Sequence, residues 1–561
     1  MIESIVWPRI RKRLGVSARA FSTNARNRNL RRAQLAFGAA WTAEWTLTVV
    51  LGVVAYRDGG ATAAGVVAFV RIAPAAVVAP LGTALADRFP RDRVLTWSCL
   101  IRAAASGVAA AVLAVDGSLR VVYGLAVVAT AAFTVFRPAH SALLPGLCMT
   151  PLELTSANVI RGFVDSVSTF AGPLLAAVLL AVASAAAAFG VVALLALLSA
   201  VAMVGLSYER APREETAPFA RIIGEIAEGF RALVRHRDAG LLTCLGLAQT
   251  FTRGALNVFA VVIAIQLLDT GEPGVGILTA AVGVGAVGGS LGASLAVGTR
   301  GLAKIQGVGV LLWGLPLALV GAFHEEAVVL ALMCVIGIGN ALVDIGLFTL
   351  LTRLVPETVV ARVMGAFESL IAVTVALGAL VTPFAIDLLG VRGALISIGL
   401  VAPLSVAIGW RRLRQIDASI GHRDEEIEVL KRLRMFRPLP MAAIDGLAVH
   451  LHLAEFAAGQ EIFHQGDDGD RFYVIDRGEA DVIGDGRLMT TIGPGDGFGE
   501  IALLRGITRT STVCARTALR LYTLDRDAFL SVVGGYRSSA DEADALVSSR
   551  LAAFAPHRDR A

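Results

Sequence analysis

Residues 82–93 read GTALADRFPRDR and separate two long apolar segments of the chain. From Asp87 to Arg93 the stretch carries three arginines and two aspartates. Each flanking segment exceeds the roughly 20 apolar residues that cross a bilayer, so the stretch is predicted to be a short loop at a membrane surface. Asp87, Arg88 and Arg91 are its candidate gating residues, because an acid at the end of one helix can bridge basic residues of a neighbouring helix and hold one conformation.

The composition excludes a wholly soluble protein. The chain has 561 residues, of which 56% are hydrophobic and 17% are charged, and its mean hydropathy is +0.70. Soluble domains carry about 25% charged residues. Disorder is excluded as well, because the apolar content is high and the net charge is only +5. The apolar residues form continuous runs rather than alternating, which disfavours an outer-membrane β-barrel.

No catalytic or metal-binding constellation is apparent in the sequence. The five cysteines are scattered and contain no CxxC pair, so they indicate neither a disulfide framework nor a zinc site. The histidines have no spacing typical of metal ligands, and no GxxxxGK[ST] motif indicates ATP binding. We therefore expect a protein without enzymatic activity, without a metal ion and without a cofactor.

Twelve apolar segments are each long enough to cross a membrane as a helix. They lie at residues 33–56, 62–86, 93–115, 119–143, 156–182, 184–207, 240–268, 274–297, 302–323, 327–352, 362–386 and 391–410. The predicted organisation is a basic cytoplasmic arm (1–32), a first six-helix half (33–207), a cytoplasmic central loop (208–239), a second six-helix half (240–410) and a linker helix (411–430).

The distribution of Lys and Arg predicts that both termini are cytoplasmic. Residues 1–32 hold nine Lys/Arg and one acid, and the central loop adds six arginines. The loops on the opposite side hold only Arg57, Arg120 and Arg392. We expect a multi-pass protein of the plasma or inner membrane. A basic arm that precedes a membrane helix typically contacts anionic lipid, so the lipid bilayer is an expected partner and nucleic acid is not.

The six-plus-six arrangement and the loop at 82–93 resemble the major facilitator superfamily. The loop matches the family pattern Gly-x-Leu-Ala-Asp-Arg-x-Gly-Arg-Arg at Leu85, Ala86, Asp87, Arg88, Arg91 and Arg93. It departs from the pattern at Thr83, Pro90 and Asp92. The resemblance implies secondary transport, in which two halves rock around a site near the middle of the membrane.

Two further stretches resemble the drug-efflux branch of that superfamily, which contains macrolide and siderophore exporters. Residues 136–158 include FRPA, ALLP and the pair Ala157-Asn158. Gly172-Pro173 resembles part of the antiporter motif, although Leu174, Leu175 and Ala176 stand where its second glycine cluster is expected. A Gly-Pro pair also kinks a membrane helix regardless of function. The resemblance implies proton-coupled efflux of small, amphipathic compounds.

Ionisable residues inside the predicted spans are candidate transport residues, because each costs at least about 2.5–3.5 kcal/mol to insert. They are Glu44, Arg71, Arg102, Asp165, Arg253 and Asp344. Glu44 and Asp165 are the preferred proton carriers, with Arg71 or Arg102 as partner. The alternative is that these acids and arginines neutralise one another as structural pairs. Arg137 and Glu368 lie nearer the predicted cytoplasmic ends and are expected at the interface.

From Arg411 onward the charge density becomes that of a soluble domain. Short strand-like runs alternate with turns such as Gly466-Asp467 and Gly484-Asp485-Gly486, which predicts a small β-barrel of the jelly-roll kind. Flanking helices are expected, the last from about Asp525 to Phe554. Residues 431–556 are predicted to be one domain.

Residues 493–504, GPGDGFGEIALL, and 509–513, RTSTV, resemble the phosphate-binding cassette of cyclic nucleotide-binding domains such as that of catabolite activator protein. The resemblance implies that the ligand is held by Gly499, Glu500, Ile501, Ala502, Arg509, Thr510 and Ser511. Backbone N–H groups at a helix start and Arg509 would bind the phosphate, and Glu500 would accept from the ribose 2′-hydroxyl. The family's C-terminal helix closes over the ligand. We expect cAMP rather than cGMP, although a hydroxyl at Thr510 also suits cGMP; the alternative is a domain that binds nothing.

The sequence therefore predicts an α-helical membrane protein with twelve spans and a C-terminal β-barrel. Its predicted function is the export of a small-molecule substrate, regulated by a cyclic nucleotide through the linker at 411–430. The alternative is a membrane-tethered cyclic nucleotide sensor whose membrane part no longer transports. A cyclic nucleotide-gated channel is disfavoured, because the sequence lacks a TVGYG-like filter.

Overall fold

The structure is a computed structural model that describes residues 27–78, 89–148, 151–206, 219–296, 301–323, 325–355, 357–439 and 441–554. The chain divides into two compact units between Arg414 and Gln415. The first unit is helical and the second contains all of the described strands. This confirms a helical membrane protein with a C-terminal β domain.

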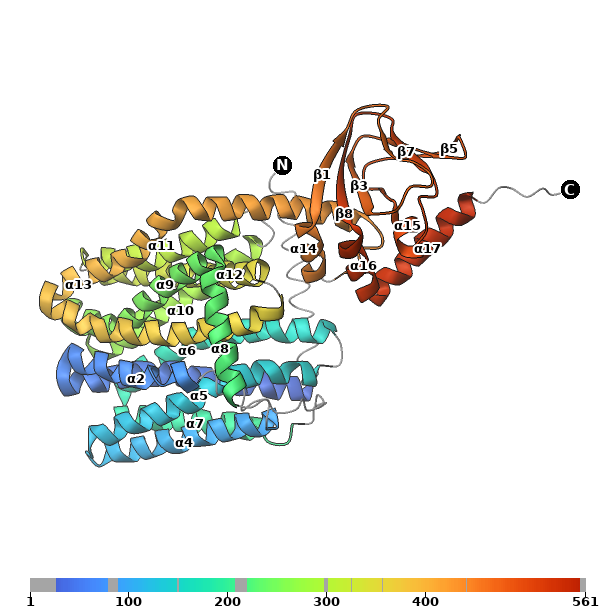
Figure 1. Cartoon of the computed structure of the whole chain (residues 1–561). Helices are drawn as coiled ribbons and strands as arrows, with labels where there is room; N and C mark the ends of the chain where they lie inside the picture. The colour runs from blue at the N-terminus through green and yellow to red at the C-terminus, as the bar shows by residue number, and fades with distance from the viewer. Residues whose placement is uncertain are drawn as a thin grey trace, which may run out of the picture. The chain divides into compact units, whose positions relative to one another are not determined.

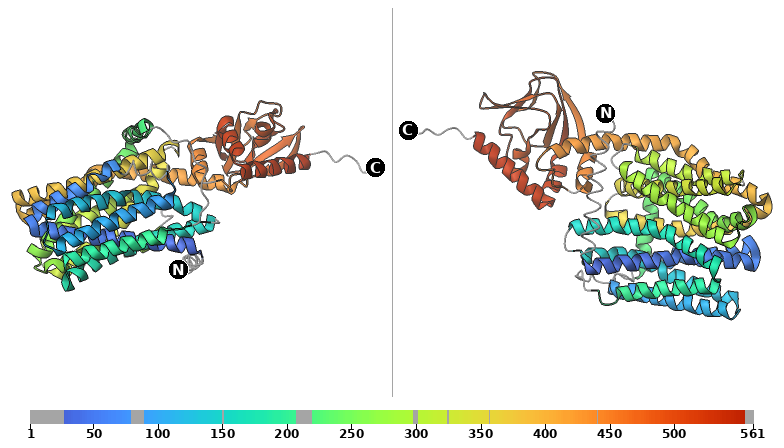
Figure 2. Two further views of the ribbon diagram at one scale, coloured as in Figure 1. Left: turned by 90° about the horizontal axis from the view of Figure 1, so that it is seen from below. Right: turned by 180° about the vertical axis from the view of Figure 1, so that it is seen from behind.

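Two groups of long helices make up the first unit (Figures 1 and 2). The first group consists of α2 (Arg28–Ile72), α4 (Arg91–Ala114), α5 (Leu119–Leu147), α6 (Pro151–Val182) and α7 (Ala185–Met203). The second consists of α9 (Arg237–Val262) with its π-helical end η1 (Ile263–Leu267), α10 (Gly271–Ala296), α11 (Leu302–Val320), α12 (Glu326–Leu354) and α13 (Glu357–Arg432). Between the groups, α8 (Phe219–Arg235) runs across the direction of the other helices (Figure 1).

Ten described helices are long and apolar enough to cross a membrane, whereas the sequence predicts twelve spans. Two of the ten are interrupted by glycine. In α2, Gly60 has φ of 65°, and in α13, Gly390 has φ of 71°, a left-handed conformation that glycine adopts without strain. Both breaks fall where the sequence predicts a turn between two spans. The contact between Arg71 and Glu44 shows that α2 turns back on itself at its break; the number twelve itself stays a prediction.

Buried aromatic side chains fill the core of the first helix group. Phe37 lies against Phe136 at 6.3 Å between ring centroids, and Trp41 lies against Phe133 at 5.0 Å. Phe37 and Phe136 are almost fully buried. These rings pack α2 against α5 within one apolar cluster. Residues of α4, α6 and α7 also belong to this cluster. The cluster fixes the helices whose cavity-facing residues are described below.

In the second group, glycines allow α10 and α12 to approach closely, as small residues commonly do between membrane helices. A Cβ atom on Gly285 would collide with the backbone carbonyl of Cys334, and one on Gly289 would lie 2.9 Å from the Cα atom of Ile338. On Gly288, by contrast, a Cβ atom would meet nothing within 4 Å. The close contact therefore uses one face of α10.

The two groups meet in an apolar seam near the break in α2. Ala55 and Ala64 of α2 pack against Val258 and Val262 of α9 and Ala379 of α13. Beside this seam the side chain of Arg57 pairs with Glu272 of α10, and the Gln266 amide donates to the hydroxyl of Tyr56. These contacts join the two helix groups at the membrane end where Gly60 lies.

The second unit is a sandwich of two antiparallel four-stranded sheets, β1-β8-β3-β6 and β2-β7-β4-β5. The strands are β1 (Leu451–Phe456), β2 (Glu461–Phe463), β3 (Arg471–Arg477), β4 (Ala480–Gly484), β5 (Arg487–Ile492), β6 (Gly497–Phe498), β7 (Thr512–Ala515) and β8 (Leu519–Asp525). The helices are α14 (Met441–Val449), α15 (Glu500–Arg505), α16 (Arg526–Gly535) and α17 (Arg537–Phe554).

Two apolar clusters hold this unit together. One lies between the sheets and includes Tyr473 and Phe498, whose rings stack at 5.0 Å. The other joins the helices to β3 through Phe436, Phe472 and Phe529. The expectation of a single helix from Asp525 to Phe554 is wrong, because Gly534 and Gly535 end α16 and Tyr536 is extended, with φ of −126°.

The packing of α10 on α12 predicts that Gly285→Ala destabilises the protein. The added methyl group has to displace backbone, at a cost of about 1–3 kcal/mol. Gly288→Ala is the matched control, because its methyl group meets open space and alanine favours a helix by about 0.5–1 kcal/mol. In detergent, the midpoint of thermal unfolding should fall for the first variant only. Equal midpoints would contradict the close approach of the two helices.

Candidate functional site

A cavity of about 400 Å³ lies between the two helix groups of the first unit. Its wall is contributed by α2, α5 and α6 from one group and by α9 to α13 from the other. Its described aromatic lining consists of Phe37, Trp41, Trp45, Trp313, Phe348 and Phe367. The volume falls within the roughly 300–1,000 Å³ of small-molecule sites.

Six ionisable side chains line this cavity. They are Arg137, Arg161 and Asp165 from the first group and Arg253, Asp344 and Glu368 from the second. Within the described part of the chain, no ion pair under 4 Å joins any two of them. The Asn340 amide donates to Asp344 Oδ2 at 3.1 Å, and Asp165 Oδ1 is buried without a hydrogen-bond partner. The cavity thus holds carboxylates whose hydrogen-bonding capacity is only partly used.

Two of the arginines lie over tryptophan rings of α2. The guanidinium carbon of Arg137 lies 5.6 Å from the ring centroid of Trp41, and that of Arg253 lies 5.7 Å from Trp45. Such cation–π contacts stabilise a desolvated cation by about 2 kcal/mol. Because Arg253 belongs to α9, its contact with Trp45 joins the two halves across the cavity.

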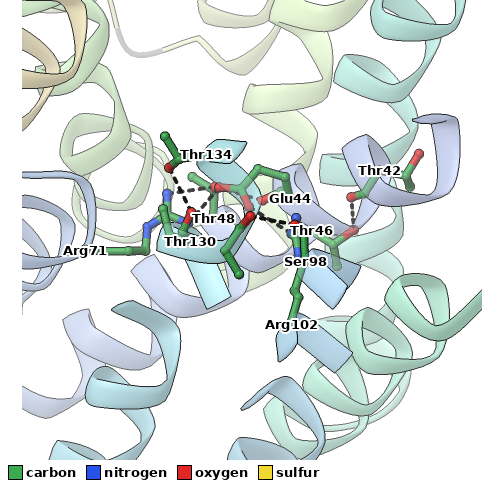
Figure 3. A network of polar contacts seen from close by, with 10 residues as sticks. Thr42, Glu44, Thr46, Thr48, Arg71, Ser98, Arg102, Thr130 and Thr134 are labelled. Carbon is green, nitrogen blue, oxygen red and sulfur yellow. Dashed lines mark hydrogen bonds and ion pairs between the residues drawn. The ribbon is translucent and has the colours of Figure 1, made fainter. Parts of the chain in front are cut away.

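The structure separates the predicted transport residues into two sets. Asp165, Arg253 and Asp344 share the cavity wall. Glu44, Arg71 and Arg102 are not among its described lining residues. They form a triad in which Glu44 Oε1 lies 3.1 Å from Arg71 Nη1 and Glu44 Oε2 lies 2.8 Å from Arg102 Nη2 (Figure 3).

The triad is buried inside the first helix group. Arg102 is 1% exposed and its guanidinium group lies 4.4 Å from the ring centroid of Phe133. Arg71 also donates to Thr48 Oγ1 at 3.0 Å. One carboxylate therefore contacts two guanidinium groups, and it connects both arms of α2 with α4. This geometry fits the alternative reading of Glu44 as a member of a structural pair.

Arg137 and Glu368 were expected at the membrane interface, but the structure places both on the cavity wall. Helix α5 continues to Leu147 rather than ending at 143, and α13 begins at Glu357 rather than at 362. Arg161 also lines the cavity. The sequence does not identify it as a candidate, because it lies near the start of the predicted segment 156–182.

The gating residues are only partly described. Asp87 and Arg88 lie outside the described residues. Arg91, the first residue of α4, donates from Nη1 to the carbonyl of Ala142 in α5 at 2.6 Å. The contact ties the end of the loop to a neighbouring helix of the same group.

A second, smaller pocket of about 60 Å³ lies in the second unit. All seven predicted ligand residues line it, namely Gly499, Glu500, Ile501, Ala502, Arg509, Thr510 and Ser511. Gly499 has φ of 90° and precedes α15, so the backbone turns sharply at the start of this helix. Phe463 and Arg550 are among the other residues that line the pocket.

Arg509 is held inside this pocket by two backbone carbonyls and by the carboxylate of Asp470, to whose Oδ1 atom Arg509 Nη2 donates at 3.3 Å. Its Nη1 donates to the Gly499 carbonyl at 2.9 Å and its Nη2 to the Arg471 carbonyl at 2.8 Å. The guanidinium carbon lies 4.3 Å from the ring centroid of Phe463. Its Nε is buried without a partner, so one charge-bearing donor is available to an anion. Burial also raises the pKa of the neighbouring Tyr473, which keeps that hydroxyl neutral.

Glu500 is 1% exposed and is paired with the C-terminal helix. Arg550 of α17 donates from Nη1 to Glu500 Oε1 at 2.7 Å and to the Gly497 carbonyl at 2.8 Å. Glu500 Oε2 is buried without a partner. Sequence reasoning missed Arg550, because one arginine in a charged helix 50 residues from its partner carries no local signal.

The comparisons with known proteins agree with this architecture. The sequence profile described as Major Facilitator Superfamily matches residues 35–368 and, in a second match, 242–458. The chain therefore belongs to the major facilitator superfamily. The profile described as cyclic nucleotide-binding domain matches residues 453–536, which contain the second pocket's predicted ligand residues.

Solved structures similar to the chain cover about a quarter of it. One, described as cAMP-bound PfPKA-R (141–441), is 24% identical over 25% of this chain and 48% of its own, with a TM-score of 0.23. The regulatory domain of Toxoplasma gondii protein kinase A with cAMP is 25% identical over 24% of this chain and 52% of its own, with a TM-score of 0.22. The sensor domain of the regulator DNR from Pseudomonas aeruginosa is 18% identical over 23% and 90%, with a TM-score of 0.22. The chain thus spans about half the length of the first two.

The triad predicts that Glu44→Gln destabilises the protein more than a cavity substitution does. Removing the carboxylate leaves Arg71 and Arg102 without a counter-charge, and breaking a buried pair costs about 3–5 kcal/mol. The control is Glu368→Gln on the cavity wall. In detergent, the midpoint of thermal unfolding should fall clearly for Glu44→Gln and stay unchanged for Glu368→Gln. A stable Glu44→Gln protein that has lost proton-driven transport would instead assign Glu44 to proton coupling.

Proposed function

We propose that this protein is a secondary transporter of the plasma or inner membrane that exports small amphipathic compounds in exchange for protons. We further propose that a cyclic nucleotide, cAMP in preference to cGMP, regulates it through the cytoplasmic C-terminal domain. The observation that carries the proposal is the cavity between the two helix groups, whose wall combines aromatic rings with Asp165 and Asp344. Aromatic surface suits the apolar part of a substrate and carboxylates suit an exchangeable cation.

Proton coupling needs a carboxylate that meets both the proton and the substrate. Asp165 and Asp344 line the cavity and are free of a close ion pair within the described residues. A proton and a cationic substrate group can therefore compete for them as access alternates. Glu44 is held between two guanidinium groups and is not among the described residues of that wall. We therefore assign Glu44 a structural role and propose Asp165 and Asp344 as the proton carriers.

The contacts between the halves support uptake of substrate from the cytoplasm. The apolar seam and the Arg57–Glu272 pair join the halves near Gly60. Given cytoplasmic termini, that end faces the opposite side of the membrane. A transporter whose halves are in contact on the non-cytoplasmic side can take up substrate from the cytoplasm, as an exporter must.

The second pocket supports a regulatory nucleotide site. Arg509 Nε and the backbone N–H groups of α15 would bind the cyclic phosphate. The remaining wall is mainly apolar, with Val482, Ile492 and Val513 among its residues. An apolar wall suits adenine better than guanine, which has an additional carbonyl and amino group to desolvate. Regulation would pass through residues 411–430 and requires that the nucleotide bind one transport state more tightly than the other.

Arg509→Ala should abolish or greatly weaken nucleotide binding. A charge-assisted hydrogen bond contributes about 1.5–3 kcal/mol, which corresponds to roughly a 10- to 100-fold loss of affinity. We would measure equilibrium binding of labelled cAMP and cGMP to the full chain in detergent. Arg487→Ala on the exposed strand β5 is the matched control and should bind as wild type does. Undiminished binding by Arg509→Ala would contradict the phosphate site, and a preference for cGMP would correct the base assignment.

Asp165→Asn and Asp344→Asn should each abolish proton-driven export. An amide keeps the size of the side chain but cannot exchange a proton. We therefore expect the rate of proton-driven export to fall by about tenfold or more. We would follow labelled erythromycin and ethidium in inside-out vesicles with an imposed pH gradient. Asp238→Asn is the control, because Asp238 pairs with Arg412 outside the cavity.

The same assay separates the transporter from the sensor. Wild-type vesicles that accumulate either probe only with a pH gradient, and at a rate that cAMP changes, would support regulated export. A wild-type protein that binds cAMP but moves neither probe, with variants that behave identically, would favour the membrane-tethered sensor.

A further inference from the structure

The cavity between the helix groups carries as many positive as negative side chains. Its described lining includes three arginines and three acids, so the formal charge of this lining is zero. Asp165 and Asp344 interact electrostatically with both Arg137 and Arg253. Within the part of the chain that the structure describes, however, no ion pair under 4 Å joins these groups. Opposite charges that face one cavity without touching are open to a ligand that lies between them.

Two of the arginines lie against aromatic rings rather than against acceptors. The guanidinium carbons of Arg137 and Arg253 lie 5.6 Å and 5.7 Å from the ring centroids of Trp41 and Trp45, respectively. A ring offers these cations no oxygen, and neither side chain has a hydrogen bond to any described residue. The N–H groups of both arginines are therefore available to an acceptor that enters the cavity.

The same two arginines come from different halves of the membrane unit. Arg137 belongs to α5 and Arg253 to α9. Trp41 and Trp45 are four residues apart on α2, so their side chains lie one turn apart on one face of that helix. Guanidinium forks match the geometry of a carboxylate. A carboxylate placed over this face can accept hydrogen bonds from both halves. The third arginine, Arg161, is less available, because it donates to the hydroxyl of Ser141.

A substrate with charge of one sign does not match this lining. A cation could pair with Asp165 or Asp344, but it would lie near guanidinium groups that have no acceptor. An anion could accept from those guanidinium groups, but it would face three carboxylates. Like charges repel strongly where water is displaced. A molecule that carries both charges supplies a partner to each set and leaves the net charge of the cavity unchanged.

We propose that the substrate is an amphipathic zwitterion, whose carboxylate binds Arg137 and Arg253 and whose ammonium group binds Asp165 or Asp344. The inference rests on the proposed function and narrows its substrate class. The ammonium group is the part of the substrate that competes with the proton, so the exchange of substrate for protons is retained. The aromatic lining of the cavity contacts the body that separates the two charges.

Three probes that share one aromatic body test the substrate class. Ciprofloxacin carries a carboxylate and an ammonium group, its methyl ester carries only the cation, and N-acetylciprofloxacin carries only the anion. We would measure equilibrium binding of each probe to the full-length protein in detergent by the fluorescence of the probe. Wild type should bind ciprofloxacin about tenfold more tightly than either derivative, because each derivative lacks one charge-assisted contact. Equal affinities for the three probes would overturn the proposal.

Arg137→Gln and Arg253→Gln separate a binding role from a structural one. Each should lower the affinity for ciprofloxacin about tenfold. The affinity for the methyl ester should stay the same or rise, because a cation that repels the ester has been removed. Arg120→Gln is the matched control, since Arg120 is an exposed residue of α5 and is not among the described lining. A parallel loss of ciprofloxacin and ester binding in both variants would show that the arginines support the structure only, which overturns the proposal.

Transport in inside-out vesicles with an imposed pH gradient distinguishes failure of this inference from failure of the proposed function. Accumulation of ciprofloxacin at a higher rate than its methyl ester would support both. Accumulation of ethidium without ciprofloxacin would leave the transporter in place and refute the zwitterionic substrate. If no probe is bound or moved, the proposed export fails and the inference fails with it.

Discussion

The cost of an unpaired charge in a low-dielectric interior organises both units of this protein. In the membrane unit it joins Glu44 to two arginines, and this triad ties the two arms of α2 to α4. In the soluble unit it holds Arg509 against two backbone carbonyls and Glu500 against Arg550. In the triad the charges lie in close contact and tie helices to one another. In the cavity, Asp165 and Asp344 keep unused hydrogen-bonding capacity.

The cavity follows from the way each half is packed around such fixed points. Aromatic contacts and the triad stiffen the first helix group, and glycine contacts between α10 and α12 stiffen the second. The two bodies meet at the apolar seam near Gly60 and along α6 and α10, where a Cβ atom on Gly276 would collide with the carbonyl oxygen of Pro173. Arg253 over Trp45 is a weaker contact across the same interface.

Local motifs could be predicted from the sequence, and long-range partners could not. The cassette residues lie in two short runs of sequence, and the structure brings all seven to one pocket, because one turn and one short helix hold them together. Hydropathy places Glu44, Asp165 and Asp344 within predicted spans, but it does not specify which face of a helix meets the cavity. For the same reason the positions of Arg137 and Glu368 on the cavity wall could not be predicted. Arg550 is linked to Glu500 only through the tertiary fold.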